Sequence, residues 1–383
     1  MFGTMKSWKW LTGGVYSWGF AARVVVKAAA LFLVINVIYA LLNPIPFIGR
    51  LSVYNTLVPG RERLPYGEST ASNNLSLNSI EAMFASHVIT QPKPADEFRL
   101  LVIGDSSVWG ILLENDDTLA GQIDALNLTI DGRRVNAYNM GHPILSVTKD
   151  LMILDEAMRY QPDAILWSIT LESLPYRDQL TPPLVANNAA RVRDLIARYE
   201  LPIDPNDDAF VERTFLDRTL VGDRRAVADW LRLQMVGFAW NATGIDQVIG
   251  DYTPRSNDFS ADPSWNAYAD ETDIPADALA FDVIAAGYTL AGDIPMLLVN
   301  EPIYLADGEN SDIRYNAWYP RWAYDQYRTM LTDAAAANGW QLIDLWDTIA
   351  PEAFTDSPVH LTPSGSRQLA ERITAALMEH LAR

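Results

Sequence analysis

The chain has 383 residues, of which 49% are hydrophobic and 20% charged, a composition typical of a globular protein. Its net charge of −19 is uneven, because residues 1–50 hold five basic side chains and no acidic one, which leaves −24 on the remainder (−19 less +5). A body that acidic repels phosphate backbones, so nucleic-acid binding is not expected. The absence of cysteine excludes disulfides, thiol catalysis and cysteine-ligated metal. No metal-ligand spacing or phosphate-binding glycine loop is seen, so no cofactor and no metal are expected.

Residues 1–45 are predicted to anchor the chain in a membrane. The apolar stretch that ends at Leu42 has about the ~20 residues that a bilayer core requires, and Arg23 and Lys27 can reach one interface. Basic residues precede the stretch, which predicts a cytoplasmic N-terminus and an extracytoplasmic main domain. A cleaved signal peptide is the alternative, but Asn43-Pro44 follow in place of a small-residue cleavage site. The upstream aromatic residues suit an interfacial helix, or a tail lying against the protein: Trp8, Trp10, Tyr16, Trp18 and Phe20.

The rest of the chain predicts a single α/β domain. Residues 46–97 are polar and punctuated by proline and glycine, and are expected to form a connector with little core of its own. From residue 98 short apolar strands alternate with helices, which predicts a parallel, flavodoxin-like three-layer domain over 98–383. The predicted strands are 98–103, 134–139, 163–169, 295–299 and 340–345. The predicted helices are 118–126, 147–160, 322–336 and 362–382.

The pattern is interrupted between about residues 174 and 290. Two stretches there are helix-like, 189–199 and 223–238, while 251–277 is acidic and aperiodic. We interpret the region as an insertion that caps the domain, because the strand and helix pattern resumes afterwards. A separate second domain is the alternative.

Ser106 is the candidate nucleophile. It follows Gly104-Asp105 at the end of the first predicted strand, where a helix is expected to begin. Open α/β sheets place their sites outside this edge, and the first N–H groups of a helix would face the same point. A serine needs such donors, and a base, to attack an ester. The alternative is a simple turn in which Ser106 or Ser107 caps the helix.

His360 is the candidate base, since it lies in a loop after the last strand and just before the last helix. Asp356 is close enough in sequence to orient and polarise its imidazole. Thr362 and Pro363 are typical of a helix cap and first position, which fixes the loop. A solvated loop histidine is the alternative.

These motifs resemble the SGNH/GDSL hydrolase superfamily over residues 98–173 and 295–383. Gly104-Asp105-Ser106 is similar to its first block, and Asp356 with His360-Leu361-Thr362-Pro363 to its last. The order, nucleophile first and then aspartate and histidine at the end, is that of this superfamily rather than of the α/β hydrolases. The resemblance implies that Ser106 attacks, His360 acts as base and Asp356 orients it.

Two blocks depart from the family pattern. In Asn139-Met140-Gly141-His142-Pro143-Ile144, Ile144 stands where the family has a glycine whose N–H binds the oxyanion. Glu172 stands where the family has an asparagine that donates a second bond, which an ionised carboxylate cannot do. A protonated Glu172 would serve, or Thr170 or Ser173 in its place. The resemblance thus implies an oxyanion and substrate site at Gly141, Ile144 and Glu172. The last block differs as well, because Asp356 stands four residues before His360 where three is commonest.

Other candidates are weaker. His142 is a substrate contact or a loop histidine. Asn300 and Glu301 follow the fourth strand, so they lie near the same edge and are candidate substrate contacts. His87 and His380 are expected to be structural. An aromatic group around the start of the predicted helix 322–336 suits sugar stacking or a core: Tyr315, Trp318, Tyr319, Trp322 and Tyr324.

The sequence therefore predicts acyl transfer through an acyl-serine. The resemblance implies an O-acetyl esterase or O-acyltransferase acting on envelope or secreted glycans, with a membrane-bound O-acyltransferase as a partner. A catalytically silent accessory subunit of a membrane complex is the second hypothesis. A lipid esterase or thioesterase would use the same residues.

Overall fold

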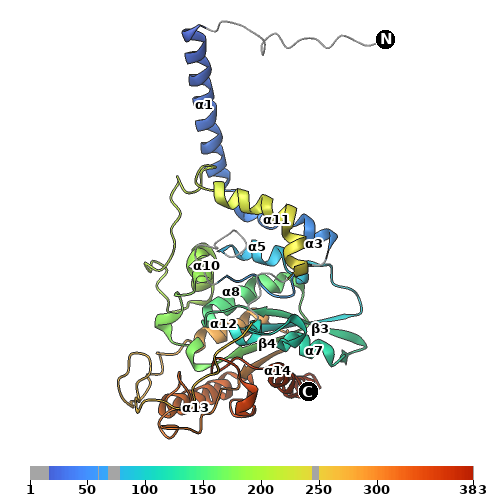
Figure 1. Cartoon of the computed structure of the whole chain (residues 1–383), viewed down its shortest axis with the longest axis vertical. Helices are drawn as coiled ribbons and strands as arrows, with labels where there is room; N and C mark the ends of the chain where they lie inside the picture. The colour runs from blue at the N-terminus through green and yellow to red at the C-terminus, as the bar shows by residue number, and fades with distance from the viewer. Residues whose placement is uncertain (1–16, 59, 68–77, 244–249, 383) are drawn as a thin grey trace. The chain divides into compact units, whose positions relative to one another are not determined.

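The computed structural model describes residues 17–58, 60–67, 78–243 and 250–382 (Figure 1). The chain divides into two compact units. The smaller comprises Met1–Ile45 and Arg213–Val227, and the larger comprises Pro46–Glu212 and Ala228–Arg383.

A six-stranded sheet forms the centre of the larger unit, in the order β2-β3-β1-β4-β5-β6. Its strands are β1 (Glu97–Gly104), β2 (Thr129–Ile130), β3 (Arg133–Gly141), β4 (Ala164–Ile169), β5 (Met296–Asn300) and β6 (Gln341–Asp344). The short β2 pairs antiparallel with β3, and the other neighbours pair in parallel. Without β2 the order is 2-1-3-4-5 in chain order, which is the flavodoxin-like order. The predicted parallel, flavodoxin-like α/β fold is confirmed.

Helices cover both faces of this sheet, which is why β1, β4 and β5 are buried along their whole length and read as unbroken apolar runs. Alternate residues of β1 enter opposite cores: Leu101 and Ile103 face one, Leu100 and Val102 the other. The first core is closed by α8 (Val147–Ala157), α12 (Phe281–Ala291) and α13 (Arg321–Asn338). The second is closed by α7 (Leu119–Ala125) and α14 (Pro363–Leu381).

The helix α12 was not predicted. It lies inside the stretch 174–290 assigned to the insertion, yet it is the helix that leads into β5 and packs against α8. Its Gly287 explains the missing signal, since glycine lowers helix propensity. A side chain there would meet Trp167 of β4, because a Cβ would lie 2.2 Å from the indole ring. The interruption of the α/β pattern thus ends before Phe281, and α9 (Pro183–Asn187), α10 (Ala189–Tyr199) and α11 (Arg224–Thr243) are its helices.

The connector packs into the domain core. It contains α3 (Val53–Leu57), α5 (Ile80–Ala85) and the 3-10 turn Val88–Thr90, with α2 (Ile45–Ile48) before them. Five of its side chains are fully buried in the same core as α8: Leu64, Ile80, Met83, Phe84 and Ile89. The described part of residues 46–97 therefore completes the core of the α/β domain.

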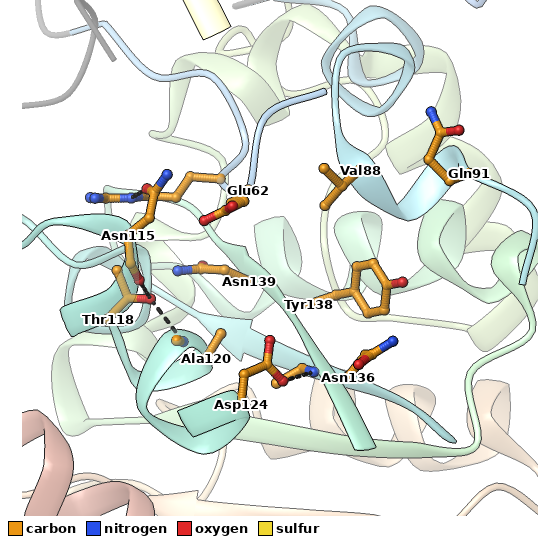
Figure 2. Close-up of a pocket in the computed structure, with 13 residues that line it drawn as sticks. Glu62, Val88, Gln91, Asn115, Thr118, Ala120, Asp124, Asn136, Tyr138 and Asn139 are labelled. Atoms are coloured by element: carbon orange, nitrogen blue, oxygen red, sulfur yellow. Dashed lines mark hydrogen bonds between the residues drawn. The ribbon is translucent and has the colours of Figure 1, made fainter. Parts of the chain in front are cut away.

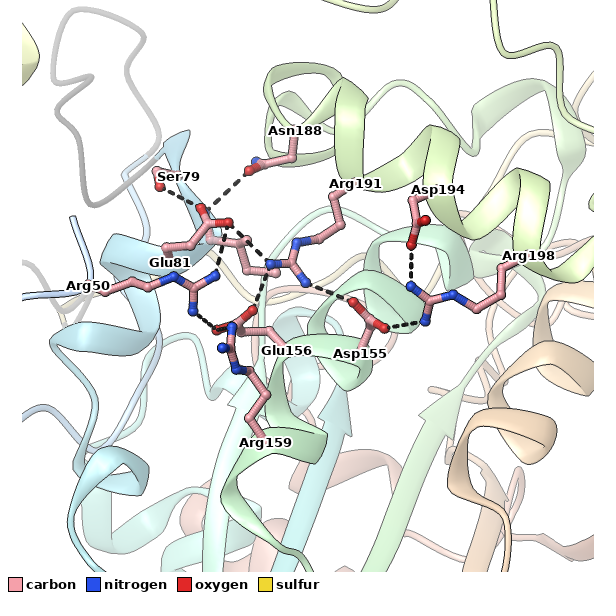
Figure 3. Close-up of polar contacts among 11 residues, drawn as sticks. Arg50, Ser79, Glu81, Asp155, Glu156, Arg159, Asn188, Arg191, Asp194 and Arg198 are labelled. Carbon is pink, nitrogen blue, oxygen red and sulfur yellow. Dashed lines mark hydrogen bonds and ion pairs between the residues drawn. The ribbon is translucent and has the colours of Figure 1, made fainter. Parts of the chain in front are cut away.

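A network of ion pairs joins the connector to the domain (Figure 3). Arg191 of α10 lies 3.1 Å from Glu81 of α5 and 2.7 Å from Glu156 of α8. Arg50 pairs with the same Glu156 at 2.8 Å. The Glu156 side chain is only 1% exposed, so these two guanidinium groups offset the cost of burying its charge.

In the smaller unit, α1 (Trp18–Leu42) is a 25-residue helix with a mean hydropathy of 2.4 over its most apolar window. It is long and apolar enough to cross a membrane, by length and composition. Trp18 and Phe20, expected to precede the span, belong to this helix. The other predicted interfacial residues, Trp8, Trp10 and Tyr16, lie outside the described residues.

Candidate active site

The candidate nucleophile, Ser106, sits on a tight turn between β1 and the short helix α6 (Ser106–Trp109). Asp105 caps this helix by accepting a 2.8 Å bond from the N–H of Ser107. Two glycines let the turn sit against the strand ends. A Cβ at Gly104 would lie 2.6 Å from Val108, and one at Gly141 would lie 2.3 Å from the backbone nitrogen of Trp109. The turn therefore places Ser106 at the carboxyl edge of the sheet, as predicted.

The structure brings Ser106, His360 and Asp356 into one hydrogen-bonded chain. The Nε2 atom of His360 lies 2.9 Å from the Oγ atom of Ser106. Its Nδ1 atom lies 2.8 Å from Oδ1 of Asp356. Both distances fit the arrangement in which an aspartate fixes the tautomer of a histidine base. The hydrogen bond from His360 holds the pKa of the Asp356 carboxyl below its usual value, so it stays ionised at neutral pH.

The loop that carries His360 is held by its own backbone. The N–H of Thr355 donates to the carbonyl of His360 at 2.8 Å, and the N–H of His360 donates to Oγ of Ser357 at 3.1 Å. Thr362 then caps α14, with Pro363 as its first residue. The Ser357 turn accommodates the extra residue between aspartate and histidine, so the four-residue separation still lets Asp356 reach the imidazole.

Ile144 adopts the backbone conformation of the glycine that it replaces. Its φ is +73°, in the left-handed region that β-branched residues rarely enter. Such a conformation costs about 1–3 kcal/mol and persists only where its surroundings impose it. Among the described residues, no acceptor is found for the N–H of Ile144 or for that of Ser106. Neither N–H group is therefore used within the described part of the fold.

The other predicted site residues have protein partners. The N–H of Gly141 donates to Oδ1 of Asn139 at 3.0 Å, so the role of Gly141 is the close approach to α6. Glu172 accepts a 2.9 Å bond from the indole of Trp265, which lies in the insertion, and burial raises the pKa of its carboxyl. Asn300 is fully buried, and its amide binds Asp344 and the Tyr327 hydroxyl. We assign Asn300 to the core and propose no substrate contact for it.

Glu301 lies directly behind the nucleophile turn. Its Oε2 atom accepts a 2.5 Å bond from the hydroxyl of Ser107 and a 3.4 Å bond from that of Ser168. Burial, together with the nearby Asp105, raises the pKa of the Glu301 carboxyl well above its usual value. Its position after β5 placed Glu301 near this edge, but no local sequence pattern indicates its contact with Ser107.

The remaining histidines do not join the triad. His142 follows Gly141 but is buried, its Nδ1 lies 3.0 Å from the carbonyl of Pro143, and its ring packs edge-on against Tyr66. Burial and the nearby Lys149 lower its pKa to about 3. His87 is fully buried, as expected for a structural residue. In the aromatic group, Tyr315, Tyr319 and Tyr324 are buried core residues.

A polar cavity of about 280 Å³ lies beside β3 (Figure 2). It is lined by Asn115 and Thr118 before α7, by Asp124 of α7, and by Asn136 and Asn139 of β3, and not by any triad residue. Asp124 accepts a 2.7 Å bond from the N–H of Ala137, and burial raises its pKa to about 6. The described residues contain no cluster of three or more acidic or histidine side chains that could hold a metal ion.

The chain matches no protein-family model and no curated protein. It is similar in structure to a member of the lipolytic protein G-D-S-L family from Veillonella parvula, with 12% identity, a TM-score of 0.33, and coverage of 72% of this chain and 96% of that one. A carbohydrate acetylesterase family member from Sinorhizobium meliloti has 11% identity, a TM-score of 0.33, and coverage of 74% and 99%. The aryl esterase of M. smegmatis has 13% identity, a TM-score of 0.30, and coverage of 73% and 99%.

At TM-scores this low, the class of the protein rests on its own topology and site. A serine, a histidine and an aspartate are joined on a flavodoxin-like sheet. The serine follows the first strand, and the aspartate and histidine precede the last helix. This order of serine, aspartate and histidine on a flavodoxin-like sheet agrees with the resemblance to the SGNH/GDSL hydrolase superfamily that the sequence motifs indicate.

Proposed function

We propose that the chain is a membrane-anchored, extracytoplasmic serine esterase or O-acyltransferase that acts on acylated envelope or secreted glycans. The observation that carries the proposal is the chain of hydrogen bonds from Ser106 through His360 to Asp356. A site of this geometry supports nucleophilic attack on an ester carbonyl.

The reaction uses groups already in contact. His360 takes the proton of Ser106 as the Oγ atom attacks the ester carbonyl, and Asp356 stabilises the imidazolium that forms. The N–H groups of Ser106 and Ile144 are placed on the segments that flank the attacking atom, and they supply the donors for the oxyanion. His360 then gives its proton to the leaving alcohol, and an acyl-serine remains. Water resolves it in an esterase, and an acceptor hydroxyl in a transferase.

The apolar helix α1 supports the proposed location. It is the described helix long enough to span a bilayer, and the basic residues that precede its apolar centre favour a cytoplasmic N-terminus. The larger, acidic unit would then lie outside the cell membrane. A membrane-bound O-acyltransferase is the proposed partner, as the source of acyl groups or of acylated glycan.

One observation favours the second candidate, a catalytically silent accessory subunit. Glu172 occupies the position of the oxyanion-binding asparagine, and its carboxylate is tied to Trp265. This position therefore supplies no amide donor, and the oxyanion depends on backbone N–H groups alone. Removal of one oxyanion donor costs about 10²–10³ in kcat in serine hydrolases, so a slow or silent site is a coherent alternative.

Labelling with a fluorophosphonate and turnover of p-nitrophenyl acetate separate the two candidates. The full chain in detergent is compared with Ser106→Ala and with Ser256→Ala, an exposed serine whose hydroxyl donates to the backbone of Asp258. The proposal expects labelling and turnover in the parent chain and in the Ser256 variant, and neither in the Ser106 variant. Equal behaviour of all three proteins would exclude a Ser106 enzyme. Release of acetate from acetylated xylan but not from short lipid esters would support a glycan substrate.

A further inference from the structure

The larger unit carries an exposed apolar surface formed by α3, the residue Leu51 before it, and the part of α11 from Ala228 onward. On α11, Leu231, Met235 and Phe238 follow the i, i+4, i+7 spacing of a single helix face and are exposed. On α3, Val53 and Leu57 form an equivalent pair. Met235 is 68% exposed and Leu57 is 78% exposed. We call the set the apolar face: Leu51, Val53, Leu57, Leu231, Met235 and Phe238.

The opposite sides of these two helices pack against each other. Tyr54 is buried against Gly237, where a Cβ would lie 2.5 Å from its ring. The N–H of Val53 donates to Oε1 of Gln234 at 2.7 Å, and Nε2 of Gln234 donates to the carbonyl of Leu51 at 3.1 Å. The two segments, 180 residues apart in the chain, lie side by side in Figure 1. Both helices therefore expose the side chains of the apolar face, whereas an amphipathic helix usually buries its apolar side against the core.

The chemistry of this surface fits a bilayer interface. In the larger unit, α11 carries Asp229 and Arg232, which form an ion pair at 3.4 Å, and the two arginines at its start belong to the smaller unit. Arg232 is exposed next to Leu231. A helix with a large apolar side and an arginine beside it is suited to lie in the plane of a membrane surface, where the arginine can reach the lipid headgroups. The indole of Trp230, which donates to Leu51 at 3.2 Å, adds a side chain that favours the headgroup region.

The chain itself limits how far this surface can be from the membrane. Leu51 is nine residues beyond Leu42, the last residue of α1. Nine residues span at most ~30 Å when fully extended, and α2 shortens this segment. If α1 spans the bilayer, as the proposed function requires, the apolar face is tethered within reach of the lipid surface.

We propose that the apolar face docks on the membrane surface and inserts its side chains at the level of the lipid headgroups. This inference rests on the proposed membrane anchorage by α1. It assigns to the larger unit a second membrane contact, which holds the unit in one orientation instead of leaving it free on a tether. The occupant is the lipid interface, and a membrane-embedded protein partner is the competing occupant.

The absence of cysteine from the chain makes a direct test possible. Single variants Leu57→Cys and Met235→Cys carry an environment-sensitive fluorophore, in the full chain reconstituted into vesicles of phosphatidylcholine and phosphatidylglycerol. Brominated phosphatidylcholine quenches fluorophores that contact lipid. Thr332→Cys, on the exposed side of α13, is the matched soluble control, and Val34→Cys in α1 reports the span.

We expect bromine quenching at residues 57, 235 and 34 but not at 332. Quenching at 34 without quenching at 57 and 235 would overturn the docking proposal and leave the anchor intact, and it would direct attention to a protein partner. Absence of quenching at 34 as well would refute the anchor, and with it this inference. The two failures are therefore distinguishable, and neither depends on esterase activity.

Discussion

The ammonium group of Lys149 donates a 2.9 Å hydrogen bond to the backbone carbonyl of Ile144. The same group donates to the carbonyl of His142 and pairs with Asp150 at 3.0 Å, and it is fully buried. A buried charge of this kind fixes the loop between β3 and α8, because moving the loop would leave the ammonium unsatisfied. This clamp accounts for the left-handed backbone at Ile144, where the family has glycine. Because the clamp fixes the backbone of Ile144, it also fixes the N–H that we propose as an oxyanion donor.

Replacing Ile144 tests that role. Ile144→Gly should keep kcat/KM within a few-fold, since glycine adopts a φ of +73° without strain. Ile144→Pro removes the N–H and cannot adopt this φ, and kcat should fall by about 10²–10³. The measurement is turnover of p-nitrophenyl acetate by variants whose circular dichroism matches that of the parent. A folded proline variant with full activity would show that Ile144 is not an oxyanion donor.

Asp356→Asn tests the aspartate at the unusual four-residue separation. The amide cannot stabilise the imidazolium of His360, so kcat should fall by about 10⁴ while KM changes little. His360→Ala should cost a similar factor, and the double variant should be no worse than the more damaging single variant, because the residues act as one unit. Additive losses would indicate that Asp356 and His360 serve separate purposes.

The Glu301 carboxyl should impose a pH dependence on stability. Its pKa is raised on folding, so the folded state holds the proton more tightly than the unfolded state. The stability that it contributes is full below the ordinary pKa of 4.5 and decreases as the pH rises above it, by about 1.4 kcal/mol per unit of raised pKa. Glu301→Gln keeps a hydrogen-bond acceptor for Ser107 and removes the titration. Urea unfolding from pH 4 to 9 should show the variant gaining stability relative to the parent as the pH rises, and parallel curves would contradict the assignment.

His87 should make the stability of the fold depend on pH in the opposite direction, with stability lost as the pH falls. Burial lowers its pKa from 6.5 to about 4, so between these values the unfolded state binds a proton that the folded state does not. The contribution to stability is therefore full above pH 6.5 and is lost as the pH falls toward 4, by about 3 kcal/mol in all. His87→Asn retains an acceptor for the N–H of Ile89 and should flatten the acid limb of the urea unfolding profile. An unchanged acid limb would show that another group, such as His142, dominates it.

The site residues that could be predicted from the sequence are those positioned by local patterns rather than by tertiary contacts. Ser106, Asp356 and His360 were found because strand ends and helix starts place them, and those are local patterns. The hydrogen bond between Trp265 and Glu172 was not predicted, since it joins residues 93 positions apart through an insertion without periodicity. The contact of Glu301 with Ser107 also depends on side-chain packing behind the sheet edge.

The same distinction holds for the fold. The strands β1, β4 and β5 were predicted because burial on both faces makes each an unbroken apolar run, whereas β3 and β6 are only partly buried. The helix α12 was missed because its Gly287 makes room for Trp167, a tertiary requirement that overrides local propensity. The two-residue strand β2 is too short to produce a pattern.

The packing of residues 46–97 determines which N-terminal truncations preserve the core. The predicted connector at residues 46–97 would suggest a truncation that begins at Phe98 as a way to remove the membrane helix. That cut would strip Ile80, Met83 and Phe84 from the core and leave Glu156 without its Arg50 partner. A soluble form should instead begin between Leu42 and Arg50, so that the anchor is lost while the polypeptide that closes the core is kept.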